Sequence, residues 1–147
     1  MAKKPRKPKT PKPPERVDLV EIRNRIDSVD AELHRLMNER AGLAQQVGIS
    51  KHASGRTVDF YRPEREAQVL RAAQKRNQGP LRDEEILRLF REIMSACLAQ
   101  QEPLKVAFLG PEGTFTQQAG YKQVGHSVRA LHLPSIREVF HEVGSGA

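Results

Sequence analysis

The sequence has a single cysteine and no tryptophan, and only 5% of its 147 residues are aromatic. One cysteine excludes a disulfide within the chain and a metal site built from several cysteines. The five histidines show no spacing typical of metal ligands. No segment is apolar and long enough to cross a membrane, and no apolar stretch follows the basic amino terminus as in a secretory signal. We therefore expect a cytoplasmic, helical protein packed through Leu, Ile, Val and Ala.

The positive charge is concentrated at the amino terminus. Residues 1–16 hold five lysines, two arginines and one glutamate, a net +6 of the chain's formal +7. They also hold five of the ten prolines and no apolar run, so we expect a disordered basic tail. Such a tail can bind nucleic acid weakly, but the nearly neutral remainder favours a solubilising role and argues against a nucleic-acid partner.

An alternation of three- and four-residue steps follows the tail and predicts one helix from about residue 17 to about residue 50. The stripe consists of Leu19, Ile22, Ile26, Val29, Leu33, Leu36, Arg40, Leu43 and Val47. Such a helix is roughly 50 Å long at ~1.5 Å per residue. The other predicted helices are too short to cover its apolar stripe, so we expect a second copy of the chain to cover it in a homodimer.

Two shorter helices are predicted next. Residues 52–61 contain Gly and Ser and are expected to form a loop, after which Pro63 suits the first turn of a helix over 63–77. A third helix begins near the acidic residues 83–85 and ends before Pro103. Its predicted inward stripe is Ile86, Phe90, Ile93, Cys97 and Gln101.

The pattern changes after Pro103. Residues 105–110 and 127–133 are predicted strands, and each precedes a predicted helix, over 116–124 and 135–143, the latter with Ser135 as N-cap. This order is typical of the opening of an α/β domain with a parallel sheet. Because two strands are too few for an independent sheet, we expect residues 104–147 to be the start of a larger, incomplete domain.

Several polar residues fall on faces that should be apolar. Arg40 occupies a core position of the long helix, and Gln101 follows Cys97 by one turn. Further charged residues lie near the same seam: Arg23, Lys51, Arg62, Arg65 and Glu66. Each alone is most simply a surface residue or one of a satisfied pair. Together, the four cations Arg23, Arg40, Lys51 and Arg65, with the anion Glu66 among them, suit a small dianion, because arginine pairs well with carboxylates. No nucleophile set or metal cluster is visible, so this pattern indicates catalysis by positioning and electrostatics.

Four segments resemble known families. The all-helical chorismate mutase domain is similar to "EIRNRIDSVDAELHRLMNERAGLAQQVGISK", "YRPEREAQVL" and "GPLRDEEILRLFREIMSACLAQQ". The start of a prephenate dehydratase domain is similar to "LKVAFLGPEGTFTQQA". In this order they resemble the bacterial bifunctional P-protein family of phenylalanine biosynthesis, with a mutase domain at 17–103 and a dehydratase fragment at 104–147.

This resemblance implies a fold and an activity. The fold would be mainly α, a three-helix mutase domain in an intertwined dimer, followed by the incomplete α/β segment. The activity would be the pericyclic rearrangement of chorismate to prephenate, without metal or cofactor. Because the family's catalytic Thr-Arg-Phe segment and regulatory domain do not occur in this sequence, we expect no dehydratase activity from these 147 residues.

The resemblance also implies roles for individual residues. Arg40 would hold one substrate carboxylate, and Arg23 of the other subunit would hold the second. Lys51 and Gln101 would hydrogen-bond the ether oxygen. Glu66 would accept from the ring hydroxyl, and Arg65 would orient this cluster.

Two positions depart from the family pattern. Arg62 stands where some relatives have Asp, and Cys97 stands where others have Ser, which weakens a side-chain hydrogen bond there. Both are still predicted to bind substrate. The alternative function is a non-enzymatic helical dimerisation module whose basic tail binds nucleic acid. The polar residues on inward faces argue against it, because a simple interface would keep those positions apolar.

Overall fold

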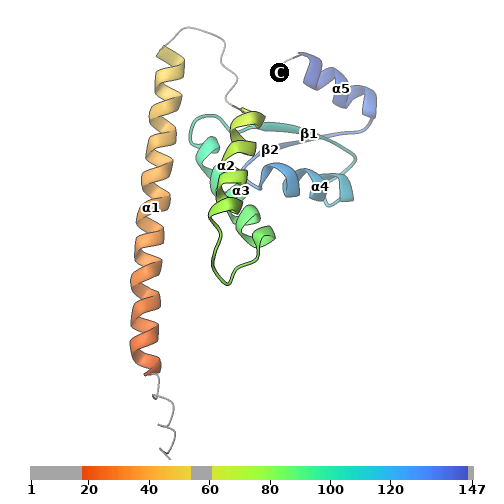
Figure 1. The fold of residues 1–147 in the computed structure, drawn as a ribbon. Coiled ribbons are helices and arrows are strands. Elements are labelled where there is room, and N and C mark those ends of the chain that lie inside the picture. The colour runs from red at the N-terminus through yellow and green to blue at the C-terminus, as the bar shows by residue number, and fades with distance from the viewer. Residues whose placement is uncertain (1–17, 54–60, 146–147) are drawn as a thin grey trace, which may run out of the picture. The chain divides into compact units, whose positions relative to one another are not determined.

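The structure is a computed structural model that describes residues 18–53 and 61–145 (Figure 1). The predicted disordered tail and most of the predicted loop over 52–61 lie outside the described residues. The chain divides into two compact units, one ending at His34 and the other beginning at Arg35. The first unit contains the amino-terminal part of a long helix, and the second contains everything that follows.

The predicted long helix is confirmed as α1, Leu19–Ala53, with 35 residues. Asp18 caps its start, because the Asp18 carboxylate accepts a hydrogen bond from Val20 N at 2.9 Å. His52 and Ala53 are helical, so the predicted loop began two residues too early. Among the described residues, no helix has both the length and the apolar content needed to span a membrane.

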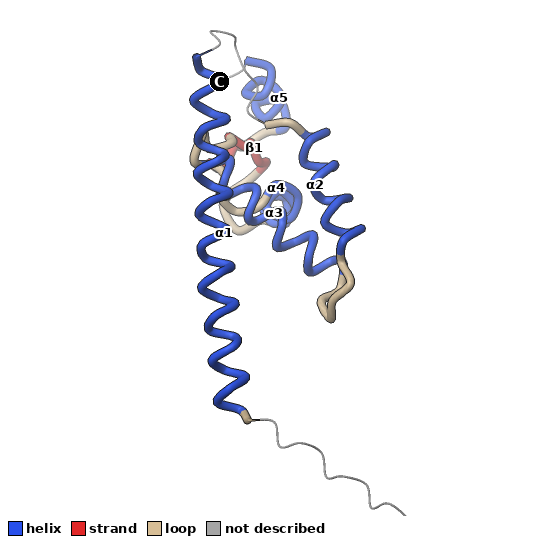
Figure 2. Tube along the Cα trace, turned by 60° about the vertical axis from the view of Figure 1, so that its left-hand side comes forward, coloured by secondary structure: helices blue, strands red, loops and turns tan. Residues whose placement is uncertain are grey.

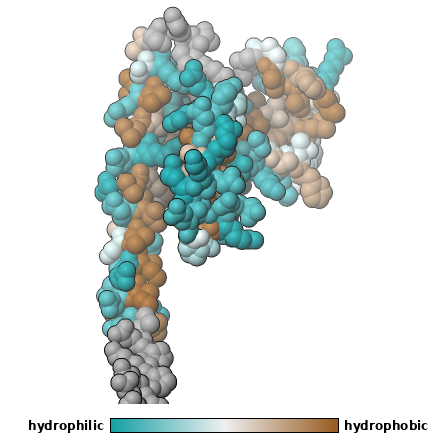
Figure 3. Space-filling model, viewed as in Figure 1, coloured by the Kyte–Doolittle hydropathy of each residue, from teal (hydrophilic) through white to brown (hydrophobic). Residues whose placement is uncertain are grey.

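The apolar stripe of α1 is exposed in the single chain. Figure 3 shows it as a run of hydrophobic residues along the helix. Leu33 is 51% exposed and Val29 is 58% exposed, values far from those of core side chains. Leaving this much apolar surface in water is unfavourable, at about 25 cal/mol per Å².

The second and third helices are α2, Pro63–Arg76, and α3, Asp83–Ala99, which lie side by side (Figure 2). Pro63 occupies the predicted first turn of α2. Asn77 Nδ2 donates to Asp83 Oδ1 at 2.7 Å and thereby ties the end of α2 to the start of α3. Hydrogen bonds from Asn77 and then Gln74 hold the pKa of the Asp83 carboxyl below its ordinary value. Ala73 and Cys97 are buried between the elements of this part.

The remaining elements are β1, Lys105–Leu109, α4, Phe115–Val124, β2, Arg129–Leu133, and α5, Ile136–Ser145. The two strands pair in parallel, with Phe108 opposite His132. This confirms the predicted strand, helix, strand, helix order and the parallel pairing. The helices α4 and α5 lie on opposite sides of the strand pair (Figures 1 and 2). Ser135 is the predicted N-cap of α5, and its Oγ accepts from Glu138 N at 3.2 Å.

Phe108 forms the core of this α/β segment. Its side chain is only 3% exposed, and its ring meets that of Tyr121 edge to face at 5.8 Å between centroids. Gln117, also buried, reaches both the Tyr121 hydroxyl at 3.0 Å and the His132 ring at 3.1 Å. The face of β1 that carries Phe108 therefore packs on α4.

We predict that Phe108→Ala lowers the free energy of unfolding by about 3–5 kcal/mol, because it leaves a cavity under α4. The matched control is Phe115→Ala, since Phe115 is 89% exposed and should change stability by less than about 0.5 kcal/mol. Urea unfolding followed by far-ultraviolet circular dichroism measures both. Equal losses in the two variants would contradict the assignment of Phe108 to the core.

Candidate active site

A cavity of about 720 Å³ lies within the second unit. The carboxy-terminal half of α1, the start of α2, the inner face of α3 and part of the α/β segment contribute to its lining. Seven of the predicted substrate-binding residues line it: Arg40, Lys51, Arg62, Arg65, Glu66, Cys97 and Gln101. Residues far apart in the sequence are thus gathered around one space.

Arg23 is the predicted site residue that does not line this cavity. It belongs to the first unit, on the exposed amino-terminal part of α1.

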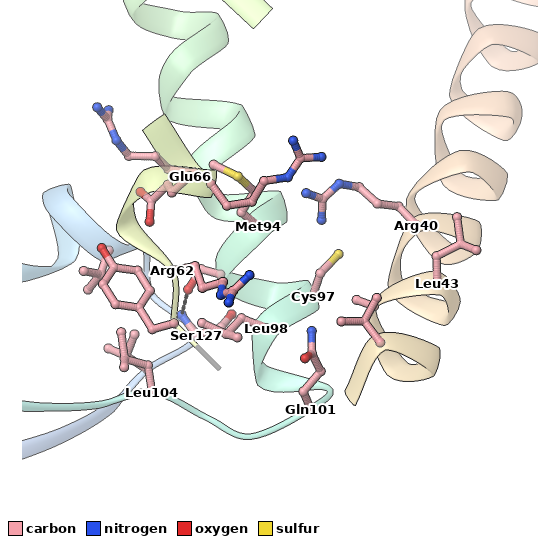
Figure 4. A pocket seen from close by; sticks show the side chains of 18 of the residues that line it. Arg40, Leu43, Arg62, Glu66, Met94, Cys97, Leu98, Gln101, Leu104 and Ser127 are labelled. Atoms are coloured by element: carbon pink, nitrogen blue, oxygen red, sulfur yellow. Dashed lines mark hydrogen bonds between the residues drawn. The ribbon is translucent and has the colours of Figure 1, made fainter. Parts of the chain in front are cut away.

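Arg40 extends from α1 toward α3, where Cys97 and Gln101 lie (Figure 4). It forms no ion pair within the part of the chain that the structure describes. The lining contains five cations, Arg40, Lys51, Arg62, Arg65 and Arg91, against the two carboxylates of Glu64 and Glu66. This excess of positive charge favours an anionic occupant, as predicted from the sequence.

Gln101 packs closely against α1 at Gly48. A Cβ added to Gly48 would lie 3.0 Å from Gln101 Cγ, which is closer than ordinary contacts allow. Gly48 lies within α1, which continues to Ala53. The missing side chain leaves room for Gln101. Gln101 Oε1 is buried and has no hydrogen-bond partner among the described residues, so this amide is available to a polar ligand.

Tyr61 is a lining residue that was absent from the predicted site. Burial, and then the charge of Glu66 and a hydrogen bond to its carboxylate, raise the pKa of Tyr61 above its ordinary value. The phenol donates to Glu66 and so helps to fix that carboxylate in the cavity. Tyr61 lay at the end of a predicted loop, where no periodic pattern indicates which way a side chain points.

Arg91 was also missed, although the sequence carried a signal for it. Leu87, Arg91, Met94, Leu98 and Gln101 follow the same alternation of four and three that identified Arg40. The predicted stripe of α3 ran beside this one and included Cys97. Both faces contribute to the lining, and Arg91 Nε is buried without a hydrogen-bond partner among the described residues.

Comparison with known proteins gives two family matches in this chain. Residues 22–102 match the family described as chorismate mutase type II, and residues 106–147 match prephenate dehydratase. The first match covers more than half of the chain. This chain belongs to the chorismate mutase type II family. The resemblance noted in the sequence and the mainly helical fold class are thereby confirmed.

Individual relatives agree with this assignment. The chain is 53% identical over 132 residues to a bifunctional chorismate mutase/prephenate dehydratase of Pseudomonas aeruginosa, and 39% identical over 130 residues to one of Aquifex aeolicus. It spans only about a third of the length of these two relatives, 36% and 35% respectively, while they match 88% and 86% of the chain. A solved chorismate mutase (form II) from Thermus thermophilus is 36% identical, with a TM-score of 0.54, covering 57% of this chain and 93% of that one.

In the described ranges, no three His, Cys, Asp or Glu side chains gather where they could hold a metal ion. Cys97 is a free, buried thiol in the cavity wall. The carbonyl oxygen of Arg62 accepts from Glu66 N at 3.0 Å, so Arg62 can reach a ligand through its guanidinium or its own N–H.

We predict that Glu66→Gln lowers the pKa of Tyr61 toward its ordinary value. The substitution removes the negative charge that opposes formation of the phenolate, whereas the contribution of burial remains. Tyr61 is one of two tyrosines, so the titration is read from tyrosinate absorbance in a Tyr121→Phe background. Glu64→Gln, on the same helix turn, is the control and should leave the titration in place. An equal change in both variants would contradict the contact.

Proposed function

We propose that the helical part of this chain catalyses the rearrangement of chorismate to prephenate. The observation that carries the proposal is that Arg40, Lys51 and Gln101, from α1 and the end of α3, line one cavity with an excess of positive charge. Chorismate carries two carboxylates on a compact frame. Such a dianion balances the charge of the cations in the cavity.

The reaction needs neither a nucleophile nor a proton donor. One C–O bond breaks while a C–C bond forms, and negative charge grows on the ether oxygen in the transition state. Lys51 and Gln101 donate to that oxygen and stabilise the transition state more than the ground state. Arg40 binds one carboxylate and holds the substrate in the compact conformer that reacts.

Residues at the start of α2, which line another side of the cavity, orient the substrate ring (Figure 4). Glu66 already accepts from Tyr61, and its remaining lone pairs accept from the substrate hydroxyl. Arg65, held at 3.4 Å from Gln68 Oε1, orients this cluster. Arg62 and Cys97 contribute to substrate binding from the start of α2 and from α3.

We also propose that the active form is a homodimer. The apolar stripe of α1 requires a cover, and a second copy of the same helix supplies one of matching length. In this arrangement Arg23 of the partner binds the second carboxylate. The predicted division into a mutase domain at 17–103 and a dehydratase fragment at 104–147 belongs to the same proposal.

Prephenate dehydratase activity is proposed only for a longer protein of the bifunctional kind, in which residues 104–147 would begin the second domain. The relatives that carry both names are about three times longer than the matched region. Location in the cytoplasm stays a prediction from the sequence. A non-enzymatic dimerisation module is less well supported, because it gives no reason for the cations in the cavity.

We predict that Arg40→Ala and Arg23→Ala each lower chorismate turnover roughly 100-fold or more, since each loses a carboxylate contact. Co-refolding the two variants in equal amounts should restore about one quarter of the wild-type rate, because half of the dimers then hold one intact site. Loss of chorismate absorbance measures the rates.

Arg35→Ala is the control, because Arg35 pairs with Glu39 on the same helix and does not line the cavity. It should keep the wild-type rate. Wild-type rates in Arg40→Ala would refute the carboxylate role. Inactive mixtures of two inactive variants would refute only the shared dimer site.

We predict that Gln101→Glu shifts the pH profile of turnover toward acid. A glutamate donates to the ether oxygen only when protonated, so activity rises as pH falls through the pKa of the introduced carboxyl group. Gln100→Glu is the control, since Gln100 is exposed beside it. An unchanged profile in Gln101→Glu would contradict the contact with the ether oxygen.

A further inference from the structure

The last residue of α4 and the loop that leads from it to β2, together residues 124–128, form part of the cavity wall. Val124, Ser127 and Val128 line the cavity together with the predicted mutase residues, and Leu104 adjoins them. Val124, Ser127 and Val128 belong to the segment that matches prephenate dehydratase. The α/β segment and the helices from Arg35 onward also form one compact unit. The mutase cavity is therefore not built by the mutase region alone.

Polar contacts fix this loop to the side of α3. The Glu92 carboxylate accepts from His126 N at 3.2 Å with one oxygen, and its other oxygen lies 2.7 Å from His126 Nδ1. One turn along, Ser127 N donates to Ser95 Oγ at 3.1 Å. Ser95 is only 6% exposed, so this hydrogen bond is shielded from water. Two consecutive loop amides are thus held by side chains of one helix.

Close packing at Gly125 completes the attachment. Gly125 has φ +81, and a Cβ there would lie 2.5 Å from Ser95 Cβ and 3.3 Å from the Arg91 carbonyl oxygen. No other residue fits between the loop and α3 without displacing one of them. The His126 ring also stacks on Tyr121 at 4.8 Å, which links the loop to the Phe108 core.

We propose that residues 124–128 are positioning residues for the mutase site, docked on α3 so that the α/β segment closes one wall of the cavity. This inference rests on the proposed function. Val124 and Val128 exclude water from the cavity, which strengthens the interaction of its cations with a dianion. The contacts at Ser95 and Arg91 fix the part of α3 that leads to Cys97 and Gln101. Displacement of the loop therefore alters the positions of Cys97 and Gln101.

The test compares Gly125→Ala with Gly113→Ala in the full 147-residue chain. Both glycines have positive φ, +81 and +85, so both substitutions strain the backbone. Only Gly125 faces α3, because nothing lies within 4 Å of a Cβ at Gly113. We expect Gly125→Ala to lower kcat/KM for chorismate roughly tenfold and Gly113→Ala to change it less than about twofold.

Hydrogen exchange tests the docking separately from activity. In Gly125→Ala, the amides of His126 and Ser127 should lose protection, while the amide of Gly110, bonded to Leu133 O at 2.8 Å, should keep it. If Gly125→Ala does not fold, Glu92→Gln with Ser95→Ala replaces it, and Glu84→Gln, exposed on α3, serves as its control. The first substitution removes the charge that holds His126 and the second removes the acceptor of the Ser127 amide, and neither adds bulk.

The outcomes separate the two proposals. Wild-type turnover of chorismate with equal kcat/KM in the Gly125 and Gly113 variants would overturn the positioning role and leave the proposed function intact. Unprotected His126 and Ser127 amides in the wild-type protein would overturn the docking itself. Absence of turnover in the wild-type protein would overturn the proposed function, and the positioning role with it.

Discussion

An excess of positive charge enclosed among helices is the constraint on which the rest of this structure depends. Arg40 stands where the stripe of α1 calls for an apolar residue, and Arg91 repeats the substitution on α3. Gathering five cations against two carboxylates in one cavity costs free energy unless an anion balances them. Sites that bind charged ligands commonly carry such an imbalance, because the bound ligand offsets the unfavourable free energy.

The surrounding architecture holds these charges in place. The helix α1 positions Arg40 and Lys51 on one face, and its Gly48 lets the end of α3 approach closely enough for Gln101 to join them. Tyr61 donates a hydrogen bond to the Glu66 carboxylate and so restricts its position. Each contact restricts a polar group before substrate arrives. A reaction that proceeds by conformational restriction and charge stabilisation depends on this kind of rigidity.

The region that matches chorismate mutase and the region that matches prephenate dehydratase are in direct contact in the structure. Ser95 and Glu92 of α3 hold the loop at 126–127, and that loop lines the same cavity as the mutase residues. Movement of the α/β segment against α3 would therefore change the cavity directly.

Local patterns in the sequence were enough to predict every helix and strand within the described residues. The order of these elements indicated parallel strands, and periodicity marked Arg40 as an anomaly. These features are local, because the spacing of apolar residues reflects which face of one element is buried. Most of the cavity's charged residues were also predicted. Arg40 and Lys51 stood out on the apolar face of the long helix, whereas Arg62, Arg65 and Glu66 were identified from their place at a helix start and from the family resemblance. Tyr61, the close approach at Gly48 and the wall formed by residues 124–128 were decided by the tertiary structure. They arise where one element meets another, and the distance between elements follows from packing that no single stretch of sequence contains.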